Sequence, residues 1–179
     1  MLKRFLSACL LVLTLGLQGC LGIGGLNSFI DDIDGYRFLY PNGWAEVQVS
    51  GGPDVVFHDI IEQTENISVV INPAPGKNSS PTSAPLGKWA TNYRRVRSRP
   101  PDSGRTAELV NAASRDLSGK TYYILEYLVT LADGRQRHNL ATASVSRGKL
   151  FTLNASTPEE RWETMKPSIQ KSISSFMVN

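Results

Sequence analysis

One cysteine of this chain lies in a motif that predicts chemistry on its thiol. Leu17-Gln18-Gly19-Cys20 has a branched residue three positions before the cysteine and a small residue directly before it, as in a bacterial lipobox. The thiolate is the nucleophilic form of cysteine, so a motif that accepts a diacylglycerol at neutral pH requires cysteine here. We therefore expect Cys20 to be lipidated. The alternative is ordinary cleavage that leaves Cys20 as an unmodified thiol.

The residues before Cys20 fit a signal peptide. Two basic residues, Lys3 and Arg4, precede an apolar run that continues to Leu17. This run is shorter than the roughly 20 residues that a permanent transmembrane helix needs. We therefore expect residues 1–19 to be removed before the protein folds.

The mature chain is expected to consist of a tether and one domain. Residues 20–28 are rich in glycine and predict a flexible tether, and residues 29–179 suffice for one domain with its own core. Acyl chains on Cys20 would hold this domain beside a membrane. Cys9 would leave with the signal peptide, so no disulfide is expected. The remaining charges nearly balance, which gives no reason to expect a nucleic-acid partner.

Two histidines are the candidate metal ligands. His58 and Asp59 stand at the end of a predicted strand and His138 lies within another, so the imidazoles meet if these strands are close. Two imidazoles and a carboxylate would suit zinc or copper. Genuine zinc sites usually show more ligands at fixed spacing, so adventitious metal binding by a surface histidine is the alternative.

Motifs for catalysis are lacking. The sequence has no Gly-x-Ser-x-Gly elbow and no Gly-rich phosphate loop, and the mature chain would have no free thiol. Glu126 is embedded in the apolar run 122–127, where a raised pKa would suit a catalytic acid. Such a carboxylate more often pairs with an arginine or binds the backbone. The sequence therefore predicts a protein that is not an enzyme.

Four arginines cluster at the end of a predicted helix: Arg94, Arg95, Arg97 and Arg99. Cations at this position complement the helix dipole, so a solvated helix end is one interpretation. The other is a docking face for acidic lipid headgroups or for an acidic loop of a partner, which Arg135 and Arg137 would extend. The pattern leaves both open.

Strand patterns dominate the rest of the chain. Alternating apolar residues and turn signals predict strands over 36–40, 47–49, 54–59, 67–71, 105–117, 120–131, 135–146 and 149–155. Asp133-Gly134 is the strongest hairpin signal. The alternating aromatic residues are predicted to be core: Tyr36, Phe38, Tyr40 and Trp44.

Two helices complete the predicted fold. The first covers 85–97 and places Leu86, Trp89, Tyr93 and Val96 on one face. The second is expected to begin with Thr157 as its cap and to be kinked or divided at Pro167. Its apolar stripe is Trp162, Met165, Ile169, Ile173 and Phe176. The expected class is α+β, with an antiparallel sheet covered by both helices.

Four ordered blocks of this sequence carry a family resemblance. They are Gly35-Tyr36-Arg37-Phe38-Leu39-Tyr40-Pro41-Asn42-Gly43-Trp44; Val55–Asp59 followed by Glu65–Val70; Tyr122–Tyr127; and Leu150–Ala155 with Arg161-Trp162. Together they resemble the PsbP family from about residue 29 to the end. The lipobox makes the chain most similar to the cyanobacterial lipoproteins of that family.

The resemblance implies an α/β/α sandwich with a central antiparallel sheet flanked by helices. It also implies a non-enzymatic protein of the thylakoid lumen, anchored by lipid to the thylakoid membrane and associated with reaction-centre subunits at the lumenal face of photosystem II.

The resemblance leaves the role within the oxygen-evolving photosystem open. Plant members use a basic N-terminal extension in retaining calcium and chloride, whereas this chain has only the short tether, so assistance with assembly or stabilisation is expected. One alternative is a permanent extrinsic subunit that aids ion retention. Another is a carrier of manganese, zinc or calcium, with His58, Asp59 and His138 as ligands.

Overall fold

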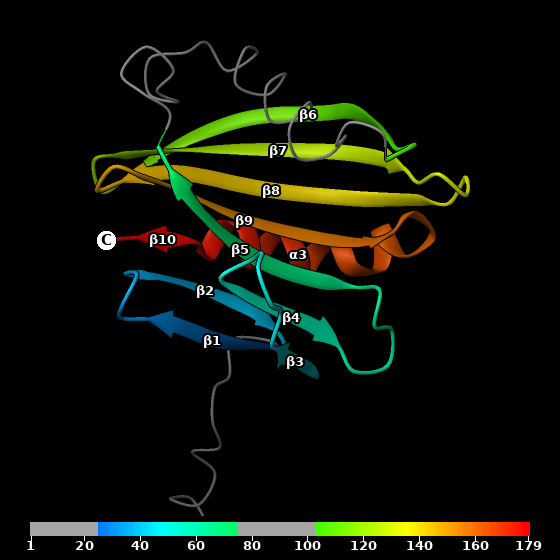
Figure 1. The fold of residues 1–179 in the computed structure, drawn as a ribbon, viewed down its shortest axis with the longest axis horizontal. Coiled ribbons are helices and arrows are strands. Elements are labelled where there is room, and N and C mark those ends of the chain that lie inside the picture. The colour runs from blue at the N-terminus through cyan, green and yellow to red at the C-terminus, as the bar shows by residue number, and fades with distance from the viewer. Residues whose placement is uncertain (1–24, 75–102) are drawn as a thin grey trace, which may run out of the picture.

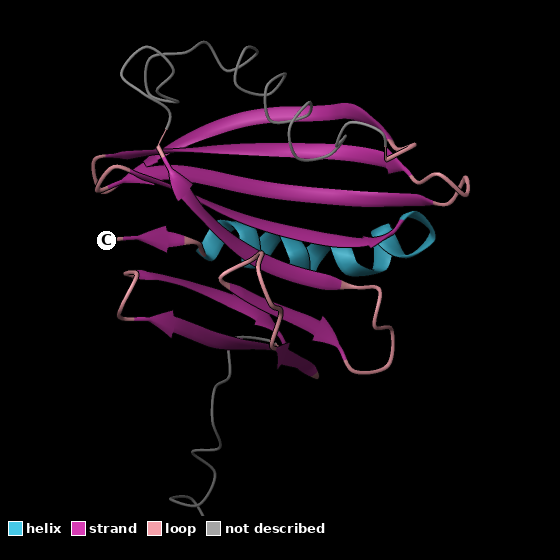
Figure 2. Cartoon of the chain, in the orientation of Figure 1, coloured by secondary structure: helices cyan, strands magenta, loops and turns pink. Residues whose placement is uncertain are grey.

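The computed structural model describes residues 25–74 and 103–179. Strands make up most of these residues, with one α-helix packed against them (Figures 1 and 2). In this part of the chain no helix combines the length and apolar character needed to cross a bilayer.

A seven-stranded sheet forms the body of the domain, and all its neighbouring strands are antiparallel. From one edge to the other its strands are β3 (Trp44–Val47), β4 (Val55–Asp59), β5 (Asn66–Pro73), β9 (Lys149–Pro158), β8 (Gln136–Ser146), β7 (Lys120–Thr130) and β6 (Thr106–Leu117). The insertion of β9 beside β5 makes the sheet more than a simple meander, because strands distant in sequence pair at its centre.

A second, three-stranded sheet and the helix cover one face of the large sheet, here called the inner face (Figure 1). The small sheet has the order β1 (Leu26–Asp31), β2 (Tyr36–Pro41) and β10 (Met177–Val178). A short 3-10 helix, η2 (Glu159–Arg161), leads into α3 (Trp162–Ser175). The opposite face of the large sheet is called the outer face.

The predicted strands are confirmed with small shifts of their ends, except that β3 covers Trp44–Val47 instead of 47–49. Strands β1 and β10 were not predicted. Because β1 begins at Leu26, the folded domain starts three residues earlier than the predicted boundary at residue 29. The predicted helix over 85–97 lies outside the described residues, so a helix is shown on the inner face alone.

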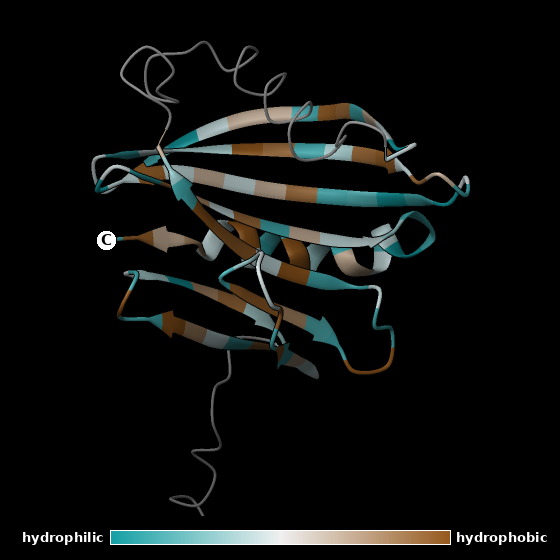
Figure 3. Cartoon of the chain, in the orientation of Figure 1, coloured by the Kyte–Doolittle hydropathy of each residue, from teal (hydrophilic) through white to brown (hydrophobic). Residues whose placement is uncertain are grey.

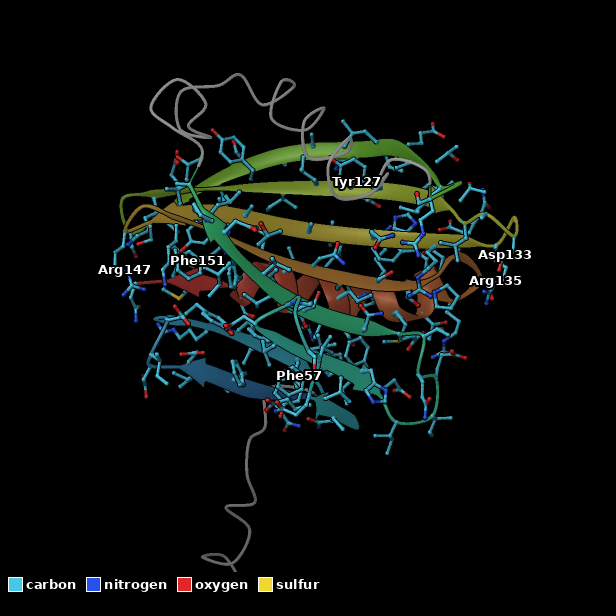
Figure 4. The ribbon with its side chains drawn as sticks, viewed as in Figure 1. Phe57, Tyr127, Asp133, Arg135, Arg147 and Phe151 are labelled. Carbon is cyan, nitrogen blue, oxygen red and sulfur yellow. The ribbon has the colours of Figure 1, made fainter. Side chains whose placement is uncertain are left out.

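Aromatic packing joins the small sheet to the large one. Tyr36 and Phe38 of β2 are each 1% exposed, as the alternating pattern predicted. The Phe38 ring lies 5.9 Å from that of Phe57 on β4, and the Tyr36 ring lies 6.2 Å from that of Phe151 on β9. Phe57 and Phe151 are labelled in Figure 4. These large rings supply much of the apolar area that stabilises the domain.

The apolar stripe of α3 is confirmed, but the predicted start of the helix is wrong. Thr157 stays in β9, where it is fully buried and its hydroxyl donates to Glu65, so it cannot cap a helix. Of the two alternatives predicted for Pro167, a kink or a division, the division is wrong, because α3 is continuous through it. Pro167 is exposed, so water can satisfy the backbone carbonyl one turn earlier that loses its partner.

Glu65 is a buried carboxylate that ties the β4–β5 connection to the start of the helical segment. Its side chain is fully buried. Oε1 accepts hydrogen bonds from the Thr157 hydroxyl at 2.8 Å and from Nε of Arg161. The side chain of Arg161 is 43% exposed, and hydrogen bonding and attraction to Glu65 raise the pKa of its guanidinium. The ion pair therefore fixes a loop that no disulfide holds.

We predict that Glu65→Gln lowers the free energy of unfolding by about 1–3 kcal/mol, because it removes the charge that two donors share. Urea denaturation should show a lower midpoint with an unchanged slope. Glu108→Gln, on an exposed position of β6, is the control and should change stability by less than about 0.5 kcal/mol. Equal midpoints for the two variants would contradict this role of Glu65.

Candidate functional site

His58 and Asp59 lie together at the end of β4. Nδ1 of His58 is 2.9 Å from the backbone oxygen of Asp59. The Asp59 carboxylate accepts hydrogen bonds from the backbone N–H groups of Glu62 and Ile61. Slight burial raises the pKa of Asp59, but these hydrogen bonds outweigh it and lower that pKa below its usual value. The Asp59 carboxylate therefore stabilises the β4–β5 loop through these hydrogen bonds.

His138 lies in a different and more enclosed setting. Its Nδ1 is 2.7 Å from Glu159 and its Nε2 is 2.8 Å from Glu126. The imidazole stacks on the Trp162 ring at 3.7 Å between centroids, with 8° between the ring planes. In the doubly protonated form the ring donates to both carboxylates. Glu126 therefore has a structural partner as expected, but that partner is a histidine instead of an arginine.

The sheet keeps the two histidines apart. His58 pairs with Asn66 on β5, and Asn66 pairs with Ser156 on β9. Ser156 in turn pairs with Asn139, the neighbour of His138. Paired residues share a face and successive residues alternate, so the two histidines lie on opposite faces. Three strand spacings, about 14 Å, also separate β4 from β8. The structure therefore does not bring the predicted metal ligands His58, Asp59 and His138 together.

Among the described residues, one group of carboxylates is close enough to share an ion. The oxygens of Asp31, Asp34 and Asp54 lie within 4.8 Å of one another. Each has a partner in the protein: Asp31 accepts from two backbone N–H groups, Asp34 pairs with Lys149, and Asp54 accepts from the Tyr36 hydroxyl at 2.5 Å. These contacts explain the group as a structural element that joins the β1–β2 turn to the start of β4.

A polar groove of about 530 Å³ lies on the outer face, over the centre of the large sheet. Six of its lining residues carry hydroxyl or amide groups: Asn66, Ser68, Asn139, Thr152, Asn154 and Ser156. Val70, Val129, Leu131 and Pro53 add apolar contacts, and Arg105 and Arg137 supply positive charge. The groove could therefore bind a polar, negatively charged group.

Arg137 is the most constrained cation of the groove. Its Nε donates to the Ser156 hydroxyl at 2.9 Å and its Nη2 donates to the backbone oxygen of Thr64. Burial lowers the pKa of its guanidinium, and the neighbouring Arg135 and Arg105 act in the same direction, whereas Glu65 and Glu62 oppose it. Within the described residues no carboxylate forms an ion pair with it.

The predicted docking arginines Arg94, Arg95, Arg97 and Arg99 lie outside the described residues. Arg135 is 72% exposed and pairs with Asp133 at the β7–β8 turn, beyond the groove lining (Figure 4). Sequence analysis missed the groove itself. Its signal is the polar alternation of Asn66 and Ser68 with Asn154 and Ser156, which becomes a surface only when β5 pairs with β9.

Comparison with known proteins agrees with this architecture. The family model described as PsbP matches residues 24–178. "CyanoP" of Thermosynechococcus vestitus is 46% identical over 99% of this chain and 100% of its own length. "PsbP-like protein 1, chloroplastic" of Arabidopsis thaliana is 36% identical over 86% of this chain and 65% of its own length. The solution structure of CyanoP from Synechocystis sp. PCC 6803 superposes with a TM-score of 0.73 at 41% identity, over 92% of this chain and 99% of that one.

The fold is that of a β-rich domain with an arginine-containing polar groove on its outer face. Among the lining residues of the groove, Arg137, Ser156, Asn66 and Asn139 have side-chain hydrogen bonds within the described part of the chain. The family match, with relatives similar over nearly the full length, identifies the chain further: it belongs to the PsbP family. At the level of its family it is therefore a photosystem II-related protein.

We predict that Tyr36→Phe makes stability less sensitive to alkaline pH. Burial and the hydrogen bond to Asp54 raise the pKa of the Tyr36 hydroxyl in the folded protein. Stability from this hydroxyl is therefore complete below the unfolded value of about 10 and is lost as the pH rises above it. Between pH 10 and 11 the native protein should lose up to ~1.4 kcal/mol more than the variant. Parallel pH profiles in urea denaturation would contradict this.

We predict that His138→Gln lowers the free energy of unfolding by about 1–3 kcal/mol, because one amide cannot satisfy both carboxylates and the stacking on Trp162 is lost. His58→Gln, at a half-buried position with one backbone contact, is the comparison and should cost less. Because the histidines lie apart, neither change should alter Zn²⁺ or Mn²⁺ affinity in calorimetry. Loss of a stoichiometric metal site in both variants would show that they act together.

Proposed function

We propose that this chain is a non-catalytic, lipid-anchored auxiliary protein that assists the assembly or stabilisation of photosystem II at the lumenal face of the thylakoid membrane. Family membership supports the link with photosystem II. The observation that carries a binding role is the arginine-containing groove on the outer face of the sheet. In this proposal it receives an acidic segment of a reaction-centre subunit.

The chemistry of the groove favours a carboxylate-bearing ligand. Arg137 is held in place by Ser156 and Thr64 and keeps a charge with no carboxylate partner among the described residues. A fixed, partly buried guanidinium interacts more strongly with an anion than a solvated one does, since the local dielectric is lower. The surrounding amides and hydroxyls can satisfy the other polar groups of a peptide.

Lipidation of Cys20 would explain how a groove that binds its partner weakly is sufficient for association. A short tether confines the domain close to the membrane that holds its partner, which raises the effective concentration of each for the other. Individual contacts can then be weak, and the protein can leave when assembly advances. This reversible behaviour favours an assembly role over permanent membership.

The two alternatives make different demands on the chain. A permanent subunit that retains calcium and chloride would be recovered with finished complexes. A carrier of manganese, zinc or calcium would need a ligand set, and His58, Asp59 and His138 do not form one together. No observation on the described residues favours either alternative, so the assembly role is the one we develop.

We predict that Arg137→Gln and Arg105→Gln each weaken binding of the immobilised mature protein to isolated photosystem II by about 3- to 10-fold, because each removes one charge from the groove. Arg105 is exposed, so its replacement should leave folding intact. Binding should also weaken as salt increases. Arg135→Gln is the matched control, since it makes the same charge change outside the groove lining. An equal loss in all three variants, or no loss in the first two, would contradict the proposal.

A further inference from the structure

The fold begins next to two exposed isoleucines. The backbone N–H of Asn42 donates to the oxygen of Gly25 at 2.9 Å, and the N–H of Ile60 donates to the oxygen of Gly43 at 3.4 Å. These bonds connect the first described residue, the β2–β3 turn and the β4–β5 loop in one continuous region. We call this region, formed by Gly25, Asn42, Gly43, Ile60 and Ile61, the anchor-side edge.

The isoleucines of the anchor-side edge are held outward by the backbone. Ile61 is 91% exposed and Ile60 is 59% exposed. The carboxylate of Asp59 accepts hydrogen bonds from the N–H groups of Ile61 at 2.7 Å and of Glu62 at 2.8 Å, which fixes the turn. Figure 3 shows this loop after β4 as a hydrophobic segment at the surface. Two adjacent β-branched apolar side chains presented in this way suit an apolar environment.

The length of chain before the fold limits where this edge can lie. Gly25 is five positions after Cys20, and a fully extended chain over five positions spans at most about 17 Å. If Cys20 carries acyl chains in a bilayer, Gly25 must stay within this reach of the membrane surface. The anchor-side edge is then the part of the described domain that faces the lipid.

We propose that Ile60 and Ile61 form a second membrane contact, inserting into the interfacial region of the bilayer beside the lipid anchor. This inference rests on the lipidation of Cys20 in the proposed function. Asp59 and Glu62 flank the isoleucines, and like charges repel, so the surface it fits is one of uncharged or zwitterionic headgroups. The contact orients the large sheet, with β3 and β4 near the bilayer and β6 at the opposite edge.

The chain offers a matched comparison for this proposal. Ile33 in the β1–β2 turn is 92% exposed, as much as Ile61. The register pairs Leu26 with Pro41 at one end of this hairpin and Asp31 with Tyr36 at the other, so Ile33 lies at the end away from Gly25. The strand between them spans roughly 17 Å. Ile33 and Ile61 are equally exposed but lie at different distances from the anchor. A difference between them therefore reports where each residue lies, because their hydrophobicity is the same.

The test measures the depth of a fluorophore at each position. The mature chain has no cysteine besides Cys20, so Ile61→Cys and Ile33→Cys can each be labelled selectively. The lipidated proteins are placed in phosphatidylcholine vesicles that carry a quencher on the acyl chains. We expect quenching at position 61 at least threefold stronger than at position 33, and weaker quenching at 61 when anionic lipid is added. Equal quenching at both positions would overturn the proposal.

A second arm separates this contact from lipidation itself. Cys20 is replaced by an N-terminal histidine tag bound to chelating lipid, which imposes the anchor chemically. Stronger quenching at 61 in this arm supports the contact even if mass spectrometry finds no acyl chains on the native protein, a result that would refute lipidation alone. Equal quenching at 61 and 33 in this arm would overturn the membrane contact whatever the state of Cys20.

Discussion

The packing of β2 and α3 onto the inner face is the constraint on which the rest of this structure depends. The rings of Tyr36 and Phe38 are buried against those of Phe151 and Phe57, and the backbone N–H of Leu39 donates to Ser175 at the end of α3. Because this layer is fixed, β1 must start where it does, beside the β2–β3 turn. The aromatic core therefore determines where the described domain begins, at Gly25, and which edge lies beside that point.

The two faces of the large sheet carry different groups of side chains. The inner face is occupied by the aromatic core and by the stacked pair His138 and Trp162. The outer face presents amides and hydroxyls over β5, β9 and β8, with Arg137 and Arg105 beside them. The same face also carries a second hydrophobic cluster over β7 and β8, formed by Tyr123, Leu125, Tyr127, Val129 and Ala143, so both faces of the sheet contain buried apolar residues. In the proposed function the polar part of the outer face binds the partner, and in the proposed membrane contact the anchor-side edge orients the domain.

Local signals in the sequence predicted most of the strands, whereas the position of the groove and of the two histidines depends on pairing between strands that are distant in sequence. Asp133-Gly134 and the alternating runs around it define β7 and β8 without any tertiary information, and Tyr36 and Phe38 read as core for the same reason. Strand β10 could not be predicted, because two residues are too few to show the alternation of apolar and polar side chains that indicates a strand. The separation of His58 from His138 depends on strand order, which placed β5 and β9 between their strands. The groove depends on that same pairing.

An assembly role is tested most directly by affinity purification of the tagged, full-length protein from thylakoids, with the recovered photosystem II separated by assembly stage. We expect enrichment of incomplete complexes that lack the manganese cluster. Near-stoichiometric recovery with active, finished complexes would contradict the assembly role and identify a permanent subunit. Recovery of no photosystem II at any stage would contradict the proposed partner.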